Sequence, residues 1–262
     1  MDIVSWRVIC TFVFVAACNL LLCLTRRGKV TPLPFLRNKL SMLGGGLIGL
    51  NWGMFVWAVE SERVVEASLG YFMNPLMNVF LGVVFLGEAL RKAQWLAVTF
   101  AAAGVLWLTI SLNAFPWVSL TLAISFALYG LIRKVAPASP LQGLRVETSV
   151  LLIPAVAFVL LRGNASENLT SDTATVILIL LSGAVTGIPL LLFASSAKRI
   201  PLSILGILQY ITPTIQFLLG VFAYNETFDS NRLIGYSIIW SGLVIFALDS
   251  FRFASSQTSH VE

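Results

Sequence analysis

Long apolar runs follow one another along the chain, with only short polar connections between them. A helix needs about 20 apolar residues to cross the hydrocarbon core of a bilayer, and it satisfies its backbone hydrogen bonds internally. The runs are long enough to cross in this way. The pattern therefore predicts an all-α integral membrane protein with nine transmembrane helices, near residues 4–24, 41–59, 65–86, 94–112, 115–132, 143–161, 174–193, 203–224 and 232–250.

The composition supports a chain that lies in lipid. Apolar residues make up 58% and charged residues 11%, whereas a water-soluble domain needs more charge on its surface. The net charge is +5, but the basic residues lie in short clusters without the aromatic patch that suits nucleic acid. We expect the lipid bilayer as a partner and no nucleic acid. Cys10, Cys18 and Cys23 lack the spacing of a metal or redox site, so we predict no metal and no cofactor.

Basic residues in the loops predict the orientation, because Lys and Arg in short loops stay on the cytoplasmic side. The first loop, residues 25–39, contains five basic residues and no acidic one, so we place it in the cytoplasm. Alternation then puts the N-terminus outside and the C-terminal tail, residues 252–262, inside. We expect a multi-pass protein of the cell inner (plasma) membrane.

The two halves of the chain repeat at a constant offset of 138 residues. Matching acidic residues end their helices on opposite sides of the membrane, so the repeats are inverted. We assign residues 1–113 to an N-terminal repeat of four helices and residues 114–251 to a C-terminal repeat of five. Matched glycines spaced four apart predict close helix packing. The matched pairs include Arg7 with Arg145, Gly45 with Gly183, Gly49 with Gly187, Pro75 with Pro213, Gly82 with Gly220, Glu88 with Glu226, and Gly104 with Gly242.

The first repeat lacks a counterpart of the run 115–132, which would precede Met1. We therefore expect that the first helix of repeat one is missing from this chain and that the complete protein has ten helices. Inverted repeats with a substrate site near the bilayer midplane are the common build of secondary transporters. The repeat therefore favours solute transport by alternating access.

Several segments resemble one known family. They are Glu66-Ala-Ser-Leu-Gly-Tyr-Phe-Met-Asn-Pro, Ser125-Phe-Ala-Leu-Tyr-Gly-Leu-Ile-Arg-Lys and Gly206-Ile-Leu-Gln-Tyr-Ile-Thr-Pro-Thr. The chain closely resembles the RarD-type members of the EamA family, in the drug/metabolite transporter superfamily, from Arg7 to Asp249. The resemblance implies the drug/metabolite transporter fold, an inner-membrane permease of two five-helix repeats.

Two prolines at matching places mark a candidate substrate site. Pro75 and Pro213 each lie within an apolar run, where proline frees carbonyl groups, kinks the helix and provides a hinge. Paired breaks in corresponding helices are a sequence pointer to a transporter's site. The uncharged polar side chains near them suit a neutral or zwitterionic solute, although such residues often only join neighbouring helices. They are Tyr71, Asn74, Asn78, Gln209, Tyr210, Thr212 and Gln216.

Glu147 is a carboxylate within the apolar run 143–161, and an ionisable residue at membrane depth is a functional candidate. It suits a proton carrier or a ligand of a cationic solute. The alternative is a position near the interface, paired with Lys134 or Arg145. Asn51 and Tyr129 complete the candidate substrate-binding residues.

The leading hypothesis is a secondary transporter of a small metabolite or drug-like solute, with protons as a second partner and no prediction of oligomeric state. No ATP-binding motif is present. The alternatives are a membrane-embedded enzyme acting on lipid or isoprenoid substrates and a non-transporting membrane scaffold. The single histidine, His260, lies in the tail, and no aspartate-rich motif exists, so we expect that the protein is not an enzyme.

Overall fold

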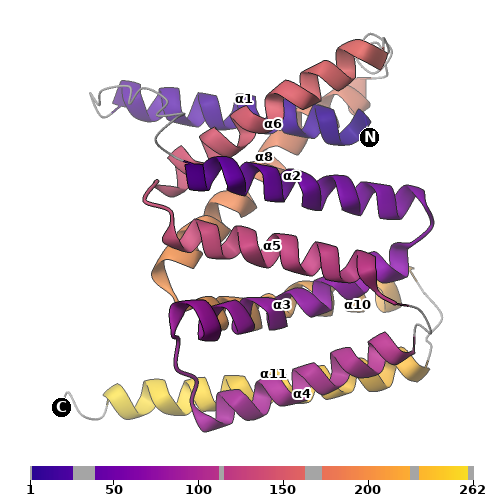
Figure 1. The fold of residues 1–262 in the computed structure, drawn as a ribbon, viewed down its shortest axis with the longest axis vertical. Helices are drawn as coiled ribbons and strands as arrows, with labels where there is room; N and C mark the ends of the chain where they lie inside the picture. Colours follow the sequence, from indigo (N-terminus) through magenta and orange to yellow (C-terminus); the bar gives the residue numbers. More distant parts are fainter. Residues whose placement is uncertain (1, 26–38, 112–114, 163–172, 225–229, 259–262) are drawn as a thin grey trace. The chain divides into compact units, whose positions relative to one another are not determined.

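The computed structural model describes residues 2–25, 39–111, 115–162, 173–224 and 230–258. The regular secondary structure in these ranges is helical (Figure 1), and nine spans within them are long and apolar enough to cross a membrane. The predicted fold class is confirmed. The helices are α1 (Asp2–Thr25), α2 (Lys39–Glu60), α3 (Val64–Leu86), α4 (Lys92–Ile110), α5 (Trp117–Val135), α6 (Pro140–Arg162), α8 (Thr173–Arg199), α9 (Leu202–Leu208), α10 (Ile211–Tyr224) and α11 (Ser230–Thr258).

One predicted span is broken in the structure. The run 203–224 forms two helices, α9 and α10, separated at Gln209 and Tyr210. Pro213 explains the break, because it has no backbone N–H and its ring clashes with the carbonyl four residues earlier, that of Gln209. That carbonyl accepts instead from the backbone N–H of Thr212, at 3.1 Å. Pro75, in contrast, lies inside α3, which continues through it.

The chain forms two compact units, and each combines helices from both halves of the sequence. Unit 1 consists of Met1–Ser61 and Leu128–Ile200, and unit 2 consists of Glu62–Ala127 and Pro201–Glu262. Helix α5 contributes residues to both units. The compact units are therefore distinct from the sequence repeats, and the assignment of those repeats remains a prediction.

In unit 1, α1 packs against α6 and α8, and α2 packs against α6. Glycines allow the close approach. A Cβ on Gly45 would lie 3.0 Å from the carbonyl oxygen of Glu147, and a Cβ on Gly183 would overlap the backbone of Cys10. The predicted packing role of these glycines is confirmed.

In unit 2, α4 lies along α11 (Figure 1). Helix α3 packs against α9. Aromatic rings also join α3 to α11, since those of Phe72 and Tyr236 stack with centroids 5.0 Å apart. The buried core contains Leu69, Phe72, Met73, Ala101, Val105, Ala123, Tyr210 and Ile239.

We expect the substitution Gly104→Ala to destabilise unit 2 by about 1–3 kcal/mol, the usual cost of overpacking. The new Cβ would lie 2.6 Å from Ile239 Cγ1 and 2.8 Å from the carbonyl oxygen of Gly235, between α4 and α11. Thermal unfolding in detergent measures the loss. Gly53→Ala is the matched control, since a Cβ there meets nothing within 4 Å and alanine favours the helix. Equal melting temperatures for the two variants would contradict the packing described here.

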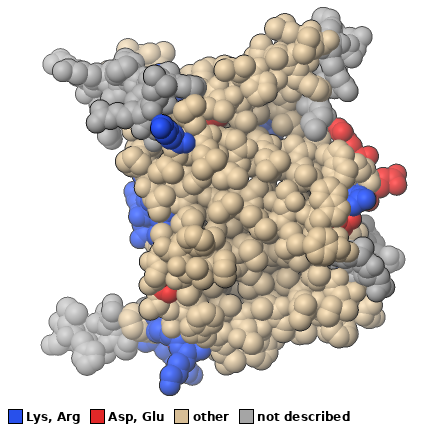
Figure 2. Space-filling view, viewed as in Figure 1, with Lys and Arg blue, Asp and Glu red and all other residues tan. Residues whose placement is uncertain are grey.

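Basic side chains lie in the last turns of α5 and α8. Most of the described surface visible in Figure 2 is uncharged, with a few Lys, Arg, Asp and Glu side chains on it. In unit 1, Lys134 donates to the carbonyls of Ala197 and Ile200 at the end of α8, while Lys198 donates to the carbonyls of Ala136 and Ala138 after α5. Each lysine thus satisfies carbonyls at the other helix's C-terminal end, where a positive charge is favoured.

Candidate functional site

An ion pair lies inside unit 1, between α5 and α6. Arg133 Nη1 donates to Glu147 Oε1 at 3.0 Å, and the side chains of both residues are only 1% exposed. The hydroxyl of Tyr129, itself fully buried, donates to Glu147 Oε2 at 3.0 Å. Arg133 Nη2 donates to the carbonyl oxygen of Pro140 at 2.7 Å. Both carboxylate oxygens therefore have donors, as a buried charge requires.

Small residues provide the space for these side chains. A Cβ on Gly143 would overlap the guanidinium of Arg133, and a Cβ on Gly44 would lie 3.2 Å from Glu147 Oε1. The ring of Tyr129 stacks on that of Phe193, with centroids 6.0 Å apart. The guanidinium keeps one spare donor, because Arg133 Nε is buried without a hydrogen-bond acceptor among the described residues.

The partners named for Glu147 under the alternative interpretation were wrong. The carboxylate pairs with Arg133 and not with Lys134 or Arg145, and it is fully buried in the protein. Arg133 lies just beyond the predicted span 115–132, but α5 extends through it to Val135. One signal in the sequence points to the correct pairing, since Tyr129 and Arg133 are four residues apart and share a helix face.

A second polar cluster lies in unit 2, where α9 ends. Asn74 Nδ2 and Asn78 Nδ2, one turn apart on α3, donate to Gln209 Oε1 at 3.0 Å and 2.7 Å. Asn78 Nδ2 also lies 3.3 Å from Asn74 Oδ1. Gly206 permits this close packing, because a Cβ there would lie 2.7 Å from the carbonyl oxygen of Pro75. Three of the predicted site residues are therefore in direct contact, at the break between α9 and α10.

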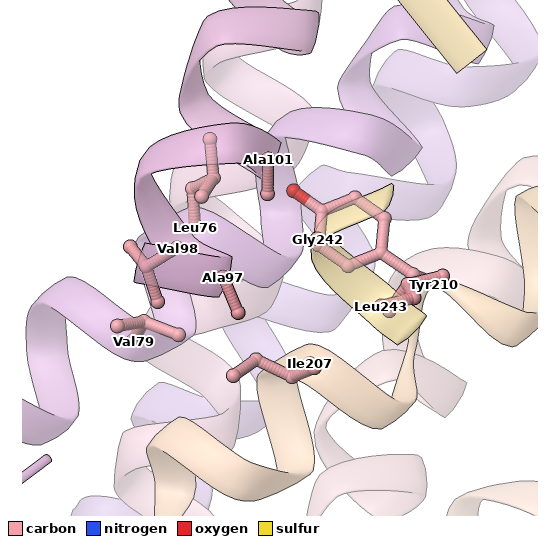
Figure 3. A pocket seen from close by; sticks show the side chains of 9 residues that line it. All are labelled: Leu76, Val79, Ala97, Val98, Ala101, Ile207, Tyr210, Gly242 and Leu243. Atoms are coloured by element: carbon pink, nitrogen blue, oxygen red, sulfur yellow. The ribbon is translucent and has the colours of Figure 1, made fainter. Parts of the chain in front are cut away.

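Two polar atoms at this break have no partner among the residues that the structure describes. They are Asn78 Oδ1 and the hydroxyl of Tyr210, and both are buried. The Tyr210 ring lines a small apolar cavity of about 10 Å³, and Figure 3 shows its hydroxyl directed toward Ala101. A cavity of that volume holds about one water molecule. The cavity is thus too small for a solute, and Asn78 does not line it.

The remaining candidates do not join these clusters. Tyr71 is 39% exposed, and Thr212 and Gln216 are also exposed. In the first repeat, the positions that match Thr212 and Gln216 are Asn74 and Asn78, and both of these are buried. Asn51 is half-buried in α2, in unit 1. The loop 25–39 and Glu226 fall largely or wholly outside the described residues.

Glu88 caps the N-terminus of α9, a role that its match with Glu226 in the repeat did not predict. Glu88 Oε1 accepts from the backbone N–H of Leu202 at 2.6 Å, and Oε2 accepts from the backbone N–H and the hydroxyl of Ser203, at 2.8 Å and 2.7 Å. A carboxylate is favoured at a helix N-terminus, where backbone N–H groups lack partners. Glu88 therefore fixes the start of α9, while the amide cluster fixes its end.

The described residues contain no group of three or more His, Cys, Asp or Glu side chains placed to hold a metal ion.

Comparison with known proteins identifies relatives over most of the chain. The sequence model of the EamA-like transporter family matches residues 1–110 and 116–248. Protein RarD of Streptomyces exfoliatus is 43% identical over 248 residues, which cover 92% of this chain and 78% of that protein. The uncharacterized transporter YojE of Bacillus subtilis is 39% identical over 266 residues, covering 99% of this chain and 88% of its own.

A crystal structure with 19% sequence identity has the same fold, with a TM-score of 0.65 over 95% of this chain and 88% of that chain. The nine apolar spans in the described part of the chain agree with a multi-pass membrane protein. On the strength of the family match and of these relatives, the chain belongs to the EamA-like transporter family, as a RarD-type member.

Proposed function

We propose that this protein is a secondary transporter of the inner (plasma) membrane that moves a small metabolite or drug-like solute by alternating access. The observation that carries the proposal is the break between α9 and α10, with buried unpaired polar atoms beside it. Transporters form their substrate sites at discontinuous membrane helices, where backbone and side-chain polar groups are free to bind. The family and the relatives named as transporters support this function over catalysis.

The amide cluster suits a neutral or zwitterionic solute. Asn78 Oδ1 is an acceptor held inside unit 2, and leaving a buried acceptor unpaired costs about 1–3 kcal/mol. A hydroxyl, amine or amide N–H of a solute would recover that cost. Asn74 and Gln209 hold Asn78 in place, so the acceptor is already oriented before the solute binds.

The break also provides a hinge for alternating access. Glu88 and the amide cluster fasten α9 to its neighbours at both ends. Helix α10 begins beyond Tyr210, and Pro213 removes a hydrogen bond that would join it to α9. Motion of α10 against a fixed α9 would open and close the amide cluster. The inverted repeats and the cytoplasmic C-terminus are part of the same proposal.

The test is accumulation of solutes by proteoliposomes that contain the full chain. The probe is a ¹³C-labelled extract of small metabolites, and mass spectrometry identifies what enters, with imposed pH gradients of either sign. We expect Asn78→Leu to lower accumulation at least about tenfold, because losing one buried hydrogen bond of about 1.4 kcal/mol has that effect. Leucine keeps the size of the side chain but removes the amide.

Thr99→Val is the matched control in unit 2. The hydroxyl of Thr99 is exposed and donates to the carbonyl of Trp95 in its own helix, so its loss should leave accumulation unchanged. Wild-type proteoliposomes that accumulate no more than empty liposomes would contradict transport and leave the scaffold alternative. Turnover of the supplied lipid without accumulation would instead support the membrane enzyme.

A further inference from the structure

The buried pair of Arg133 and Glu147 is electrically neutral as a whole. Both side chains are 1% exposed inside spanning helices, where an unpaired charge is costly. A state of this site therefore has a low free energy only if its positive and negative charges balance. This condition restricts which solutes can use the pair.

The two partners differ in how they can be neutralised. A guanidinium stays protonated in proteins, whereas a carboxylate becomes neutral by taking one proton. A cationic solute that displaced Arg133 from Glu147 would leave a buried Arg133 without an anion. An anionic solute that displaced Glu147 from Arg133 leaves a carboxylate that protonation can neutralise. The pair therefore accepts an anion together with a proton, and not a cation.

The surrounding atoms suit this exchange. Arg133 Nε is a buried N–H without an acceptor, and a guanidinium binds a planar carboxylate through two parallel N–H groups. The Tyr129 hydroxyl donates to Glu147 now, and a hydroxyl also accepts, so its oxygen can accept a hydrogen bond from the protonated carboxyl. Tyr129 can therefore hydrogen-bond to Glu147 in both its ionised and its protonated state.

We propose that Arg133 and Glu147 form an exchange site in which the carboxylate of a small solute replaces Glu147 on Arg133 while Glu147 takes up a proton. The inference rests on the proposed transport function, but it assigns the site in unit 1 a solute class that differs from the one suited to the amide cluster, namely anions that bear a carboxylate. One solute anion and one proton bind, and both leave on the other side of the membrane, which restores the ion pair.

The charged groups nearby come from several helices. Helix α5 presents Arg133 and Tyr129 to the carboxylate, and α2 presents Gly44 and Gly45. Lys198 of α8 donates to the backbone carbonyls of Ala136 and Ala138. Arg145, on the helix of Glu147 itself, is half-buried. On α1, Arg7 stacks over the ring of Trp52 at 4.6 Å. Among these named groups, Glu147 is therefore the one with a carboxylate that can take up a proton.

The experiment loads the proteoliposomes with alkaline buffer and supplies the ¹³C-labelled metabolite extract in acidic buffer. We expect the accumulated compounds to bear a carboxylate, and a monoanion to accumulate about tenfold more for each pH unit of gradient. Because one negative and one positive charge move together, a membrane potential set with potassium and valinomycin should leave monoanion accumulation unchanged.

Two variants distinguish loss of the exchange reaction from loss of folding. Glu147→Gln cannot take up a proton, so its accumulation should lose the response to the pH gradient. The double variant Arg133→Gln with Glu147→Gln leaves no unpaired charge and keeps the fold, but it should accumulate no carboxylates. Arg63→Gln removes a partly exposed ion pair with Glu66 and is the control that should keep both properties.

Accumulated compounds without a carboxylate, or a full gradient response in Glu147→Gln, would overturn the exchange site while leaving transport in place. If the wild type accumulates nothing, the proposed transport function fails, and infrared difference spectra with malate and gluconate decide the exchange site separately. A new protonated-carboxyl band in the wild type that is missing in Glu147→Gln supports it. The absence of that band in the wild type overturns it.

Discussion

Glu147→Ala should destabilise unit 1 by about 3–5 kcal/mol, the cost of breaking a buried ion pair from one side. The guanidinium of Arg133 would remain 1% exposed without its carboxylate, and the hydroxyl of Tyr129 would lose its acceptor. Thermal unfolding in detergent, followed by the far-ultraviolet circular dichroism of the helices, measures the loss. We expect this to be the largest effect of any single side-chain truncation in unit 1.

The double variant Arg133→Met with Glu147→Gln is the internal control. It removes both charges, so most of the stability should return, and a double-mutant cycle gives the coupling between the two residues. Arg133→Met alone leaves a buried carboxylate, which acid can neutralise. Its stability should therefore improve in acidic buffer, whereas that of Glu147→Ala should not, because arginine keeps its proton.

Arg63→Gln provides a comparison outside the buried network. Arg63 and Glu66 form an ion pair across 3.3 Å, and the arginine side chain is 42% exposed. Such pairs contribute about 0–1 kcal/mol. If Glu147→Ala lost no more stability than Arg63→Gln, the pair with Arg133 would not be formed in the membrane-embedded protein.

Most of the fold follows from the sequence because a single constraint dominates it. A segment that crosses lipid needs a minimum apolar length, and the run lengths record this directly. The structure confirms eight predicted spans as continuous helices in the described residues. The ninth is divided because the ring of Pro213 clashes with the carbonyl four residues earlier. Whether a proline breaks its helix depends on the packing around it. Pro75, in the matching place, leaves α3 continuous.

The site was harder to predict because burial of a charge depends on the opposite helix. Arg133 stands at the end of an apolar run, where an arginine exposed in the cytoplasm and one turned into the bundle have the same sequence pattern. Gly143 decides between the two, since only a residue without a Cβ leaves room for the guanidinium. In the same way, the repeat relates Asn78 to Gln216, but Asn78 is buried and Gln216 is exposed.

Glu88→Ala should destabilise unit 2 by about 2–3 kcal/mol and increase the motion of α9. Two backbone N–H groups, those of Leu202 and Ser203, would lose their acceptor, and the negative charge at the helix N-terminus would be lost as well. Pro201, which precedes the helix, makes no side-chain capping bond that could replace them. Hydrogen exchange at the amides of Leu202 and Ser203, read by mass spectrometry, reports the local change.

Two milder variants test whether the carboxylate itself holds α9. Glu88→Gln keeps an acceptor but loses the charge, so we expect a loss of about 1 kcal/mol. Ser203→Ala removes only the hydroxyl bond of 2.7 Å and should cost a similar amount while leaving both backbone bonds in place. Exchange at Leu202 should therefore rise most in Glu88→Ala. An unchanged exchange rate there would show that α9 is held by its packing on α3, and the hinge would then have to begin elsewhere than at Gln209.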